Sequence, residues 1–266
     1  MNKKMLKFVK IGQQNPPKRE VADRKDDFNE IYNEFIQEKA GEQASRCSQC
    51  GVPFCQVHCP LSNNIPDWLK LTAEGRLKEA YELAQSTNNM PEVCGRICPQ
   101  DRLCEGNCVI EQSGHGTVTI GSVEKYITDT AWKEGWVKPI KVKNEKKQSV
   151  GIIGAGPAGL AAAEQLRKLG YQITIYDRYD RAGGLLIYGI PNFKLEKYVV
   201  ERRTEILEKS ETTRKRKEWE LPIEYIPELA NLSHSLGLTF SCTPFYLEAV
   251  DILKPYVDFY KIASYE

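Results

Sequence analysis

The feature that most constrains this chain is the crowding of its cysteines. Eight of the nine fall within one stretch of roughly sixty residues, and only Cys242 stands apart. They form two groups, Cys47-x2-Cys50-x4-Cys55-x3-Cys59-Pro60 and Cys94-x3-Cys98-x5-Cys104-x3-Cys108. In a reducing compartment, clustering of this kind indicates metal binding rather than disulfides. We therefore expect this region to fold around metal.

The spacing also bears on which metal is bound. Thiolates two to five residues apart on irregular backbone can converge on one cube of iron and sulfide, and bacterial two-cluster ferredoxins use a Cys-Pro after an x3 gap. The alternative is two structural zinc sites of four cysteines each, which would make the region a binding or scaffold module. Zinc sites usually show paired CxxC knuckles, and only Cys47-x2-Cys50 has that spacing. Spacing alone therefore favours iron–sulfur over zinc.

Apolar periodicity predicts that this first region is helical. Apolar side chains from Phe28 to Ile36 recur at helical spacing, which predicts an amphipathic helix ending near Gly41. A helix start at Ile65-Pro66-Asp67, a stripe over 77–84 and a last helix over 122–132 follow. The cysteines are expected on the irregular segments between these helices.

Composition excludes several classes of protein. Lys and Arg number 37 and Asp and Glu 36, so the net charge of +1 provides no overall field to attract nucleic acid or an anionic membrane. A hydrophobic fraction of 41% and a charged fraction of 27% exclude disordered and fibrous classes. The length of 266 residues, at about 150 residues per domain, predicts two modest domains.

Neither a membrane span nor a signal peptide is expected. The longest uncharged run, between Lys147 and Glu164, is too short and too rich in glycine to cross about 30 Å of hydrocarbon. The basic N-terminus, MNKKMLKFVKIGQQN, lacks a continuous apolar stretch. We therefore expect a cytoplasmic protein.

A second region opens after a charged linker over 138–147. An apolar run without alternation, 150–153, predicts a strand buried on both faces. The turn Gly154–Gly159, a helix over 160–169 and a strand over 172–176 complete a βαβ unit.

The turn has the spacing GxGxxG directly between strand and helix, which is typical of dinucleotide binding. Its glycines permit a tight turn, close approach of a pyrophosphate and helix–strand packing. An acidic side chain that ends the second strand about 20 residues later can bind ribose hydroxyls. A second glycine pair tilts the choice from NAD to FAD. The candidate cofactor residues are Gly154, Ala155, Gly156, Pro157, Ala158, Gly159, Asp177, Arg178, Gly183 and Gly184.

The last part of the chain differs in composition from the parts before it. The stretch 201–220 is mostly charged, and its run Arg214–Lys217 is interpreted as a solvated helix face or linker. Beyond it, the pattern predicts helices over 226–235 and 247–253 and strands over 238–243 and 259–263.

The segments CSQCGVPFCQVHCPLSNNIPDW, NNMPEVCGRICPQDRLCEGNC, VTIGSVEKYITD, GIIGAGPAGLAAAEQL and DRAGGLLIYGIPNFKLEK together resemble the small (beta) subunit of NADPH-dependent glutamate synthase over residues 1–209. The resemblance implies an α-helical ferredoxin-like domain with two 4Fe-4S clusters over 1–146 and a truncated FAD-binding Rossmann domain over 147–209. It implies an oxidoreductase that passes electrons from NADPH through FAD and the clusters to a large subunit, where glutamine and 2-oxoglutarate give glutamate.

The resemblance also implies how the ligands are divided. One cluster would take Cys47, Cys50, Cys55 and Cys108. The other would take Cys59, Cys98, Cys104 and Glu124. Cys94 has no ligand role in that pattern, and we interpret it as a small buried thiol. No residue is assigned a catalytic role, because the substrates would bind the large subunit.

The family pattern stops after about Lys209, and no second GxGxxG fingerprint for NADPH follows. The segment from Trp219 onward resembles the N-acetylneuraminate (sialic acid) synthase family of (β/α)8 barrels, so that 210–266 would be a short α/β fragment. Lys261 would match a lysine of that family's phosphoenolpyruvate pocket, but a barrel needs about 200 residues to close. The alternatives left open are a zinc module and an inactive chimera of two joined coding fragments.

Overall fold

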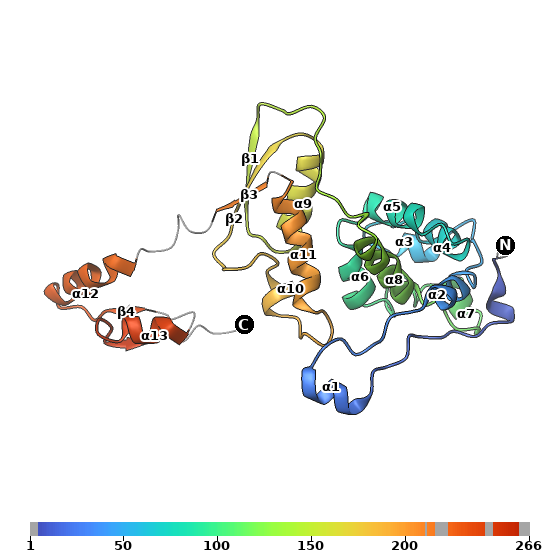
Figure 1. Ribbon diagram of the computed structural model, residues 1–266, viewed down its shortest axis with the longest axis horizontal. Coiled ribbons are helices and arrows are strands. Elements are labelled where there is room, and N and C mark those ends of the chain that lie inside the picture. Colours follow the sequence, from blue (N-terminus) through green and yellow to red (C-terminus); the bar gives the residue numbers. More distant parts are fainter. Residues whose placement is uncertain (1–4, 211, 216–222, 243–246, 261–266) are drawn as a thin grey trace. The chain divides into compact units, whose positions relative to one another are not determined.

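The computed structural model describes residues 5–210, 212–215, 223–242 and 247–260, and it divides into two compact units, 1–215 and 216–266 (Figure 1). Each unit is described by itself. Within the described residues, no helix combines the length and the apolar character that crossing a bilayer requires.

The first part of unit 1 is a helical bundle around α8 (Ile120–Lys133), which packs against four other helices (Figure 1). Its apolar face buries Val123, Ile127 and Ala131 completely, against the buried indole of Trp68. The elements of this part are η1 (Lys7–Val9), α1 (Val21–Asp27), α2 (Gln37–Ala44), α3 (Phe54–Val57), α4 (Ile65–Ala73), α5 (Leu77–Thr87), α6 (Pro91–Ile97), α7 (Val109–Gln112) and α8, and α1 lies apart from the bundle (Figure 1).

The helices expected at 65, 77 and 122 are therefore confirmed, but the helix predicted from Phe28 to Gly41 is wrong. Helix α1 ends at Asp27, just before Phe28, and α2 begins only at Gln37. The backbone between them is bonded elsewhere: Arg19 N donates to Ile31 O at 2.9 Å, and Ile31 N donates to Phe193 O at 3.2 Å. These tertiary hydrogen bonds hold the segment extended despite its helical apolar pattern.

The second part of unit 1 is a parallel sheet with the strand order β1-β2-β3, followed and flanked by helices. The βαβ unit expected from the sequence is confirmed by β1, α9 and β2. The elements are β1 (Ser149–Ile153), α9 (Pro157–Lys168), β2 (Gln172–Tyr176), α10 (Leu185–Tyr188), α11 (Lys197–Glu208) and β3 (Thr212–Lys215).

Two expectations for this sheet are corrected. Strand β1 was expected to be buried on both faces, yet exposed and half-buried residues alternate along it, and Ile153 is 94% exposed. Arg214 and Lys215 were expected in a solvated helix face or linker, yet they form part of β3. Backbone pairing does not depend on side-chain polarity, and edge strands tolerate charge.

The linker over 138–147 is irregular, as predicted, but it is fixed to the α/β part. Ile140 N donates to Ser210 Oγ at 2.9 Å, and Lys146 N donates to Gly170 O at 2.9 Å. The helical and α/β parts are also joined by α11 and α6, where Arg203 forms a buried bidentate ion pair with Glu92 at 2.6 and 2.9 Å.

Unit 2 is a small α/β fragment. It contains η3 (Ile223–Tyr225), α12 (Ile226–Ser235), β4 (Ser241–Cys242), α13 (Leu247–Leu253) and β5 (Phe259–Tyr260). Both predicted helices are confirmed, whereas the described strands are shorter than expected; Thr243 and the span 261–263, including Lys261, lie outside the described residues. Strands β4 and β5 pair in parallel, with Cys242 half-buried beside a small core.

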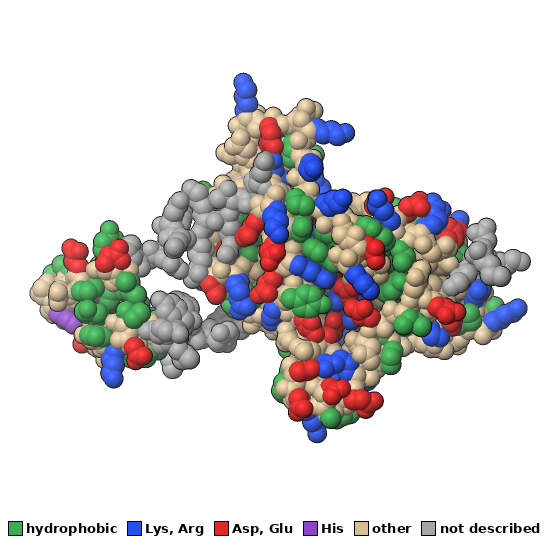
Figure 2. Space-filling model, in the orientation of Figure 1, with side chains coloured by type: hydrophobic (Ala, Val, Ile, Leu, Met, Phe, Trp, Pro, Cys, Tyr) green, Lys and Arg blue, Asp and Glu red, His purple; other side chains and the backbone are tan. Residues whose placement is uncertain are grey.

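The surfaces of the two units differ in polarity. Figure 2 shows acidic and basic side chains interspersed over the visible face of unit 1, and a concentration of apolar side chains on the visible face of unit 2. Large apolar side chains of unit 2 that are exposed to solvent are Ile223, Tyr225, Leu232, Leu236, Leu238, Ile252 and Phe259.

Candidate functional site

The first set of thiols lines one small cavity in the helical bundle. Its walls include Cys47 and Cys50 from the loop after α2, Cys55 from α3, and Cys108 at the start of α7. The remaining lining is mostly apolar, contributed by Pro66, Leu69, Val109, Ile110, Val118 and Ile120 among others. The fold therefore brings a cysteine of the second sequence group to three of the first.

Burial of Cys47 and Cys55 favours neutral thiols at these two positions when no cation is present. Burial raises the pKa of Cys55 to about 12, and burial also raises the pKa of Cys47. Thiolate ligation reverses this preference, because a bound cation removes the proton outright. Two hydrogen bonds to Cys47 Sγ, from Gln49 N at 3.4 Å and Gln49 Nε2 at 3.3 Å, stabilise negative charge on that sulfur.

The second set of groups gathers around Glu124, on the face of α8 that is turned into the bundle. Cys98, which ends α6, interacts electrostatically with Glu124, Cys104 and Cys59. Glu124 is 6% exposed, and its Oε1 accepts hydrogen bonds from Asn63 Nδ2 at 3.2 Å and from Asn88 Nδ2 at 3.3 Å.

The protonation of Glu124 follows from its burial. Desolvation raises the pKa of its carboxyl well above the usual range, and the charge of Cys94 raises it further. The amide donors Asn63 and Asn88 oppose this shift without cancelling it. A carboxyl in this position keeps its proton unless a cation takes the proton's place, which is the behaviour of a metal ligand.

Cys94 lies against the second set rather than in a remote part of the core. It occupies α6 and hydrogen-bonds to Cys98, which raises the pKa of Cys94 and lowers the pKa of Cys98. The expectation that the cysteines all occupy irregular segments is corrected here, because Cys94 and Cys55 are both helical. Spacing gives no signal for Asn63 and Asn88, which reach Glu124 from elsewhere in the bundle, or for Gln49, which lies inside the first cysteine group and donates to Cys47.

The glycine-rich turn joins β1 to the N-terminus of α9. A Cβ at Gly159 would lie 1.9 Å from Gly154 O, so only glycine allows helix and strand to approach this closely. A Cβ at Gly184 would lie 2.9 Å from Gly156 Cα, and Gly184 has φ +54°. The second glycine pair therefore packs directly on the first turn, beside the helix N-terminus where a pyrophosphate binds in folds of this type.

The acidic residue after β2 also lies at this turn. One oxygen of Asp177 accepts a hydrogen bond from Ala155 N, and the other accepts one from Tyr179 N at 2.7 Å. The neighbouring Arg178 guanidinium stacks on the Tyr179 ring at 4.8 Å and donates to its hydroxyl at 2.7 Å. The predicted residues 154–159, 177 and 183–184 thus form one contiguous surface.

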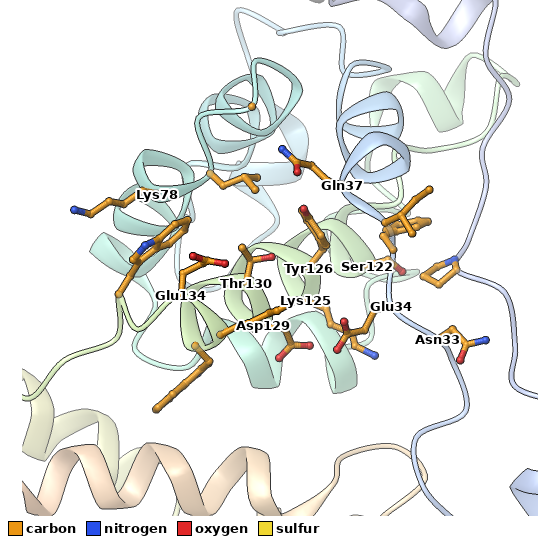
Figure 3. Close-up of a pocket in the computed structure, with 18 of the residues that line it drawn as sticks. Asn33, Glu34, Gln37, Lys78, Ser122, Lys125, Tyr126, Asp129, Thr130 and Glu134 are labelled. Carbon is orange, nitrogen blue, oxygen red and sulfur yellow. The ribbon is translucent and has the colours of Figure 1, made fainter.

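A further cavity is lined by none of these residues. It measures about 1090 Å³ and is open, and Figure 3 shows that Ser122, Lys125, Tyr126, Asp129 and Thr130 project into it from α8. None of the predicted site residues lines it. Size alone therefore does not locate the chemistry of this protein.

Comparison with known proteins identifies three segments. Residues 24–136 match the 4Fe-4S cluster domain II of dihydropyrimidine dehydrogenase, residues 152–215 match an NAD(P)-binding Rossmann-like domain, and residues 191–266 match the NeuB family. The expected succession of an iron–sulfur domain, a Rossmann segment and a sialic-acid-synthase-like segment is confirmed.

Individual relatives agree with the first two segments. The chain is 72% identical over 206 residues to the glutamate synthase [NADPH] small chain of Azospirillum brasilense, covering 77% of this chain and 43% of that protein. It is 48% identical over 206 residues to the small chain of Escherichia coli, again 77% of this chain and 43% of the relative. The chain thus spans less than half the length of these relatives. Its first three quarters are similar to glutamate synthase small chains, and residues 191–266 are similar to the NeuB family.

Proposed function

We propose that the chain is an electron-transfer oxidoreductase component of the glutamate synthase small-subunit type. One 4Fe-4S cluster would be held by Cys47, Cys50, Cys55 and Cys108, and the other by Cys59, Cys98, Cys104 and Glu124. The observation that carries the proposal is the crossing of the two sequence groups, because Cys108 lines the same cavity as Cys47, Cys50 and Cys55.

The chemistry of the residues fits such clusters. The first set provides four thiols around the wall of an apolar cavity. The second set provides three thiols and the carboxyl of Glu124, whose pKa is raised by burial. When bound, a 4Fe-4S cluster accepts and releases single electrons.

The protein's own residues then have three tasks. The apolar walls around the first set exclude water. Gln49 donates hydrogen bonds to a ligand sulfur, and Cys94 does the same for Cys98. Asn63 and Asn88 orient the Glu124 carboxylate through its Oε1 atom, which leaves Oε2 available for a metal.

We propose further that the α/β part takes FAD rather than NAD. The residues that would hold it are Gly154, Ala155, Gly156, Pro157, Ala158, Gly159, Asp177, Arg178, Gly183 and Gly184. Geometry supports a dinucleotide at this turn, since nothing lies within 4 Å of a Cβ built at Gly154 or Gly156, and the second glycine pair in contact with the turn favours FAD. Asp177 follows the second strand, where its carboxylate could accept hydrogen bonds from ribose hydroxyls in place of the one from the Ala155 backbone.

The remaining roles follow from the small-chain relatives and are also proposals. NADPH would be the electron source in the full-length family, and a large-subunit-like protein would accept the electrons and form glutamate from glutamine and 2-oxoglutarate. The boundaries we propose are 1–146 for the iron–sulfur domain, 147–209 for the FAD-binding segment and 210–266 for the NeuB-like segment. A cytoplasmic location would suit oxygen-sensitive clusters and reduced thiols.

The test is anaerobic reconstitution of the full chain with iron and sulfide. We expect a brown protein with broad visible absorbance that bleaches on reduction. Cys108→Ala should lose the cluster of the first set, about half of the bound iron, since that cluster loses one of four ligands. Cys242→Ala is the matched control and should retain all of it. A colourless protein with stoichiometric zinc would contradict the proposal.

A further inference from the structure

A buried cation without a carboxylate partner lies beside the first set of thiols. The Arg46 side chain is completely buried, and backbone carbonyls alone accept its hydrogen bonds. Its Nε donates to Ile11 O at 2.8 Å, and its Nη2 donates to His115 O at 2.8 Å and Gly116 O at 2.9 Å. Its Nη1 donates to Thr117 O. The fold satisfies the donors of this guanidinium but does not neutralise its charge.

Other buried cations of the first unit are neutralised by ion pairs. A buried charge is costly unless it is paired, and the usual solution is a carboxylate at hydrogen-bond distance. Pairs of this kind are Arg203 with Glu92, Arg96 with Asp129, Lys125 with Glu30 and Arg167 with Glu145. In the part of the chain that the structure describes, Arg46 has no such partner.

The positive charge of Arg46 lies close to the first set of thiols. It directly precedes Cys47 in the chain, and its guanidinium interacts electrostatically with Cys108. Burial lowers the pKa of Arg46, whereas Cys108 and Glu111 raise it; arginine remains protonated under such opposing influences. Glu111 is exposed, so solvent screens its charge much more than that of the buried guanidinium.

The surroundings of the second set have the opposite character. Its own carboxyl, Glu124, is bonded by neutral amides. A further carboxyl, Glu105, interacts with Cys104 and accepts a hydrogen bond from Gly121 N at 2.9 Å. Fixed positive charge therefore faces the first set, and carboxyl groups face the second.

We propose that Arg46 raises the reduction potential of the cluster at Cys47, Cys50, Cys55 and Cys108 above that of the other cluster, and so directs electrons to the first set. This inference rests on the proposed function. Reduction adds one negative charge, which a fixed cation in a low-dielectric interior stabilises. In the internal transfer, the second cluster loses one electron and is oxidised, the first gains that electron and is reduced, and no bond or proton moves. Arg46 would act through its positive charge and would not ligate iron.

The experiment is a potentiometric titration of the reconstituted full chain, followed by electron paramagnetic resonance. Glu124→Cys assigns the two reduction steps, because it changes a ligand of the second set alone. Arg46→Gln should lower the equilibrium constant for one-electron reduction of the first cluster at least tenfold, a shift of about 59 mV, and leave the second step unchanged. Arg46→Lys keeps the positive charge, so the reduction potential of the first cluster should stay close to that of the wild type. Arg76→Gln, at an exposed arginine, is the matched control and should change neither step.

A surface variant keeps the inference testable if Arg46→Gln does not load with iron. Glu111→Arg replaces an exposed carboxylate near Arg46 with a cation, so it should raise the potential of the first step, by less than Arg46→Gln would lower it because solvent screens the surface charge. The inference is overturned if a loaded Arg46→Gln protein titrates as the wild type does, if both steps shift equally, or if Glu111→Arg leaves the first step unmoved. Absence of any cluster in the wild-type chain would instead overturn the proposed function itself.

Discussion

The core of the helical part and the edge strand β1 of the α/β part differ in how far their apolar residues are buried. In the bundle, Trp68, Val123 and Ile127 have no exposed surface. In the sheet, the edge strand β1 leaves Ile153 94% exposed, and Leu169 after α9 is 59% exposed. The comparison indicates that the bundle closes a complete core around its thiols, whereas the sheet has a free edge within the described residues.

The difference also separates two kinds of site. The cysteine sites lie inside a closed core, where low dielectric strengthens every charge interaction. The glycine-rich turn lies at the end of an edge strand, where its shape depends on backbone packing. Variants in the bundle core should therefore mainly lower stability, whereas variants at the glycine-rich turn should mainly lower ligand affinity.

The largest effect is expected in the bundle core. Trp68→Ala removes a fully buried indole from among four helices and should lower the free energy of unfolding by about 4 kcal/mol, through lost burial and a cavity. Ile153→Ala at the exposed edge should change it by less than about 0.5 kcal/mol. Urea unfolding monitored by far-ultraviolet circular dichroism measures both. Equal destabilisation by the two variants would remove the contrast between the parts.

The next effect concerns the contact between the two parts. Arg203→Met should cost about 3 kcal/mol, because it leaves Glu92 buried and unpaired on α6. Arg181→Met breaks an exposed pair with Glu201 and is the matched control, with an expected cost below about 1 kcal/mol. Chemical denaturation of the metal-free proteins gives both values. A stable Arg203→Met protein would show that the ion pair does not join the parts.

A pH effect should be confined to the bundle. Because burial raises the pKa of Glu124, the folded metal-free protein holds a proton that the unfolded chain releases in mild acid. Its stabilising contribution is complete below the unfolded pKa and is lost as the pH rises towards the folded pKa. The melting temperature of the metal-free protein should therefore fall as the pH rises above about 4.5, the ordinary pKa of a glutamate, and Glu124→Gln should flatten that fall. Parallel curves for the two proteins would contradict this expectation.

The smallest effect on stability is expected at the glycine-rich turn. Gly156→Ala meets no atom within 4 Å and should leave the melting temperature unchanged, yet its methyl group would occupy the space that a pyrophosphate approaches. Flavin affinity should fall at least tenfold, about 1.4 kcal/mol, by fluorescence titration. Gly51→Ala, which also meets no atom within 4 Å, is the control for the substitution itself. Unchanged affinity in Gly156→Ala would argue against dinucleotide binding at this turn.

The sequence predicted the elements whose local pattern and tertiary environment agree. The βαβ opening, α8, α12 and α13 were all predicted, because apolar spacing, glycine and proline signals coincide there. The helix predicted from Phe28 failed because hydrogen bonds from Arg19 and to Phe193 hold that backbone extended. Such long-range bonds leave no mark in local periodicity.

The sites divide in the same way. Cysteine number and spacing predicted metal binding, and the GxGxxG turn predicted a dinucleotide site after β1, because both chemistries depend on residues that are close in sequence. The family resemblance had implied that Cys108 joins Cys47, and the structure agrees, because both line one cavity. Only the tertiary structure placed Asn63 and Asn88 on Glu124 and surrounded Arg46 with carbonyls. These contacts join residues far apart in the chain, and only the packing of the helices around α8 decides which of them meet.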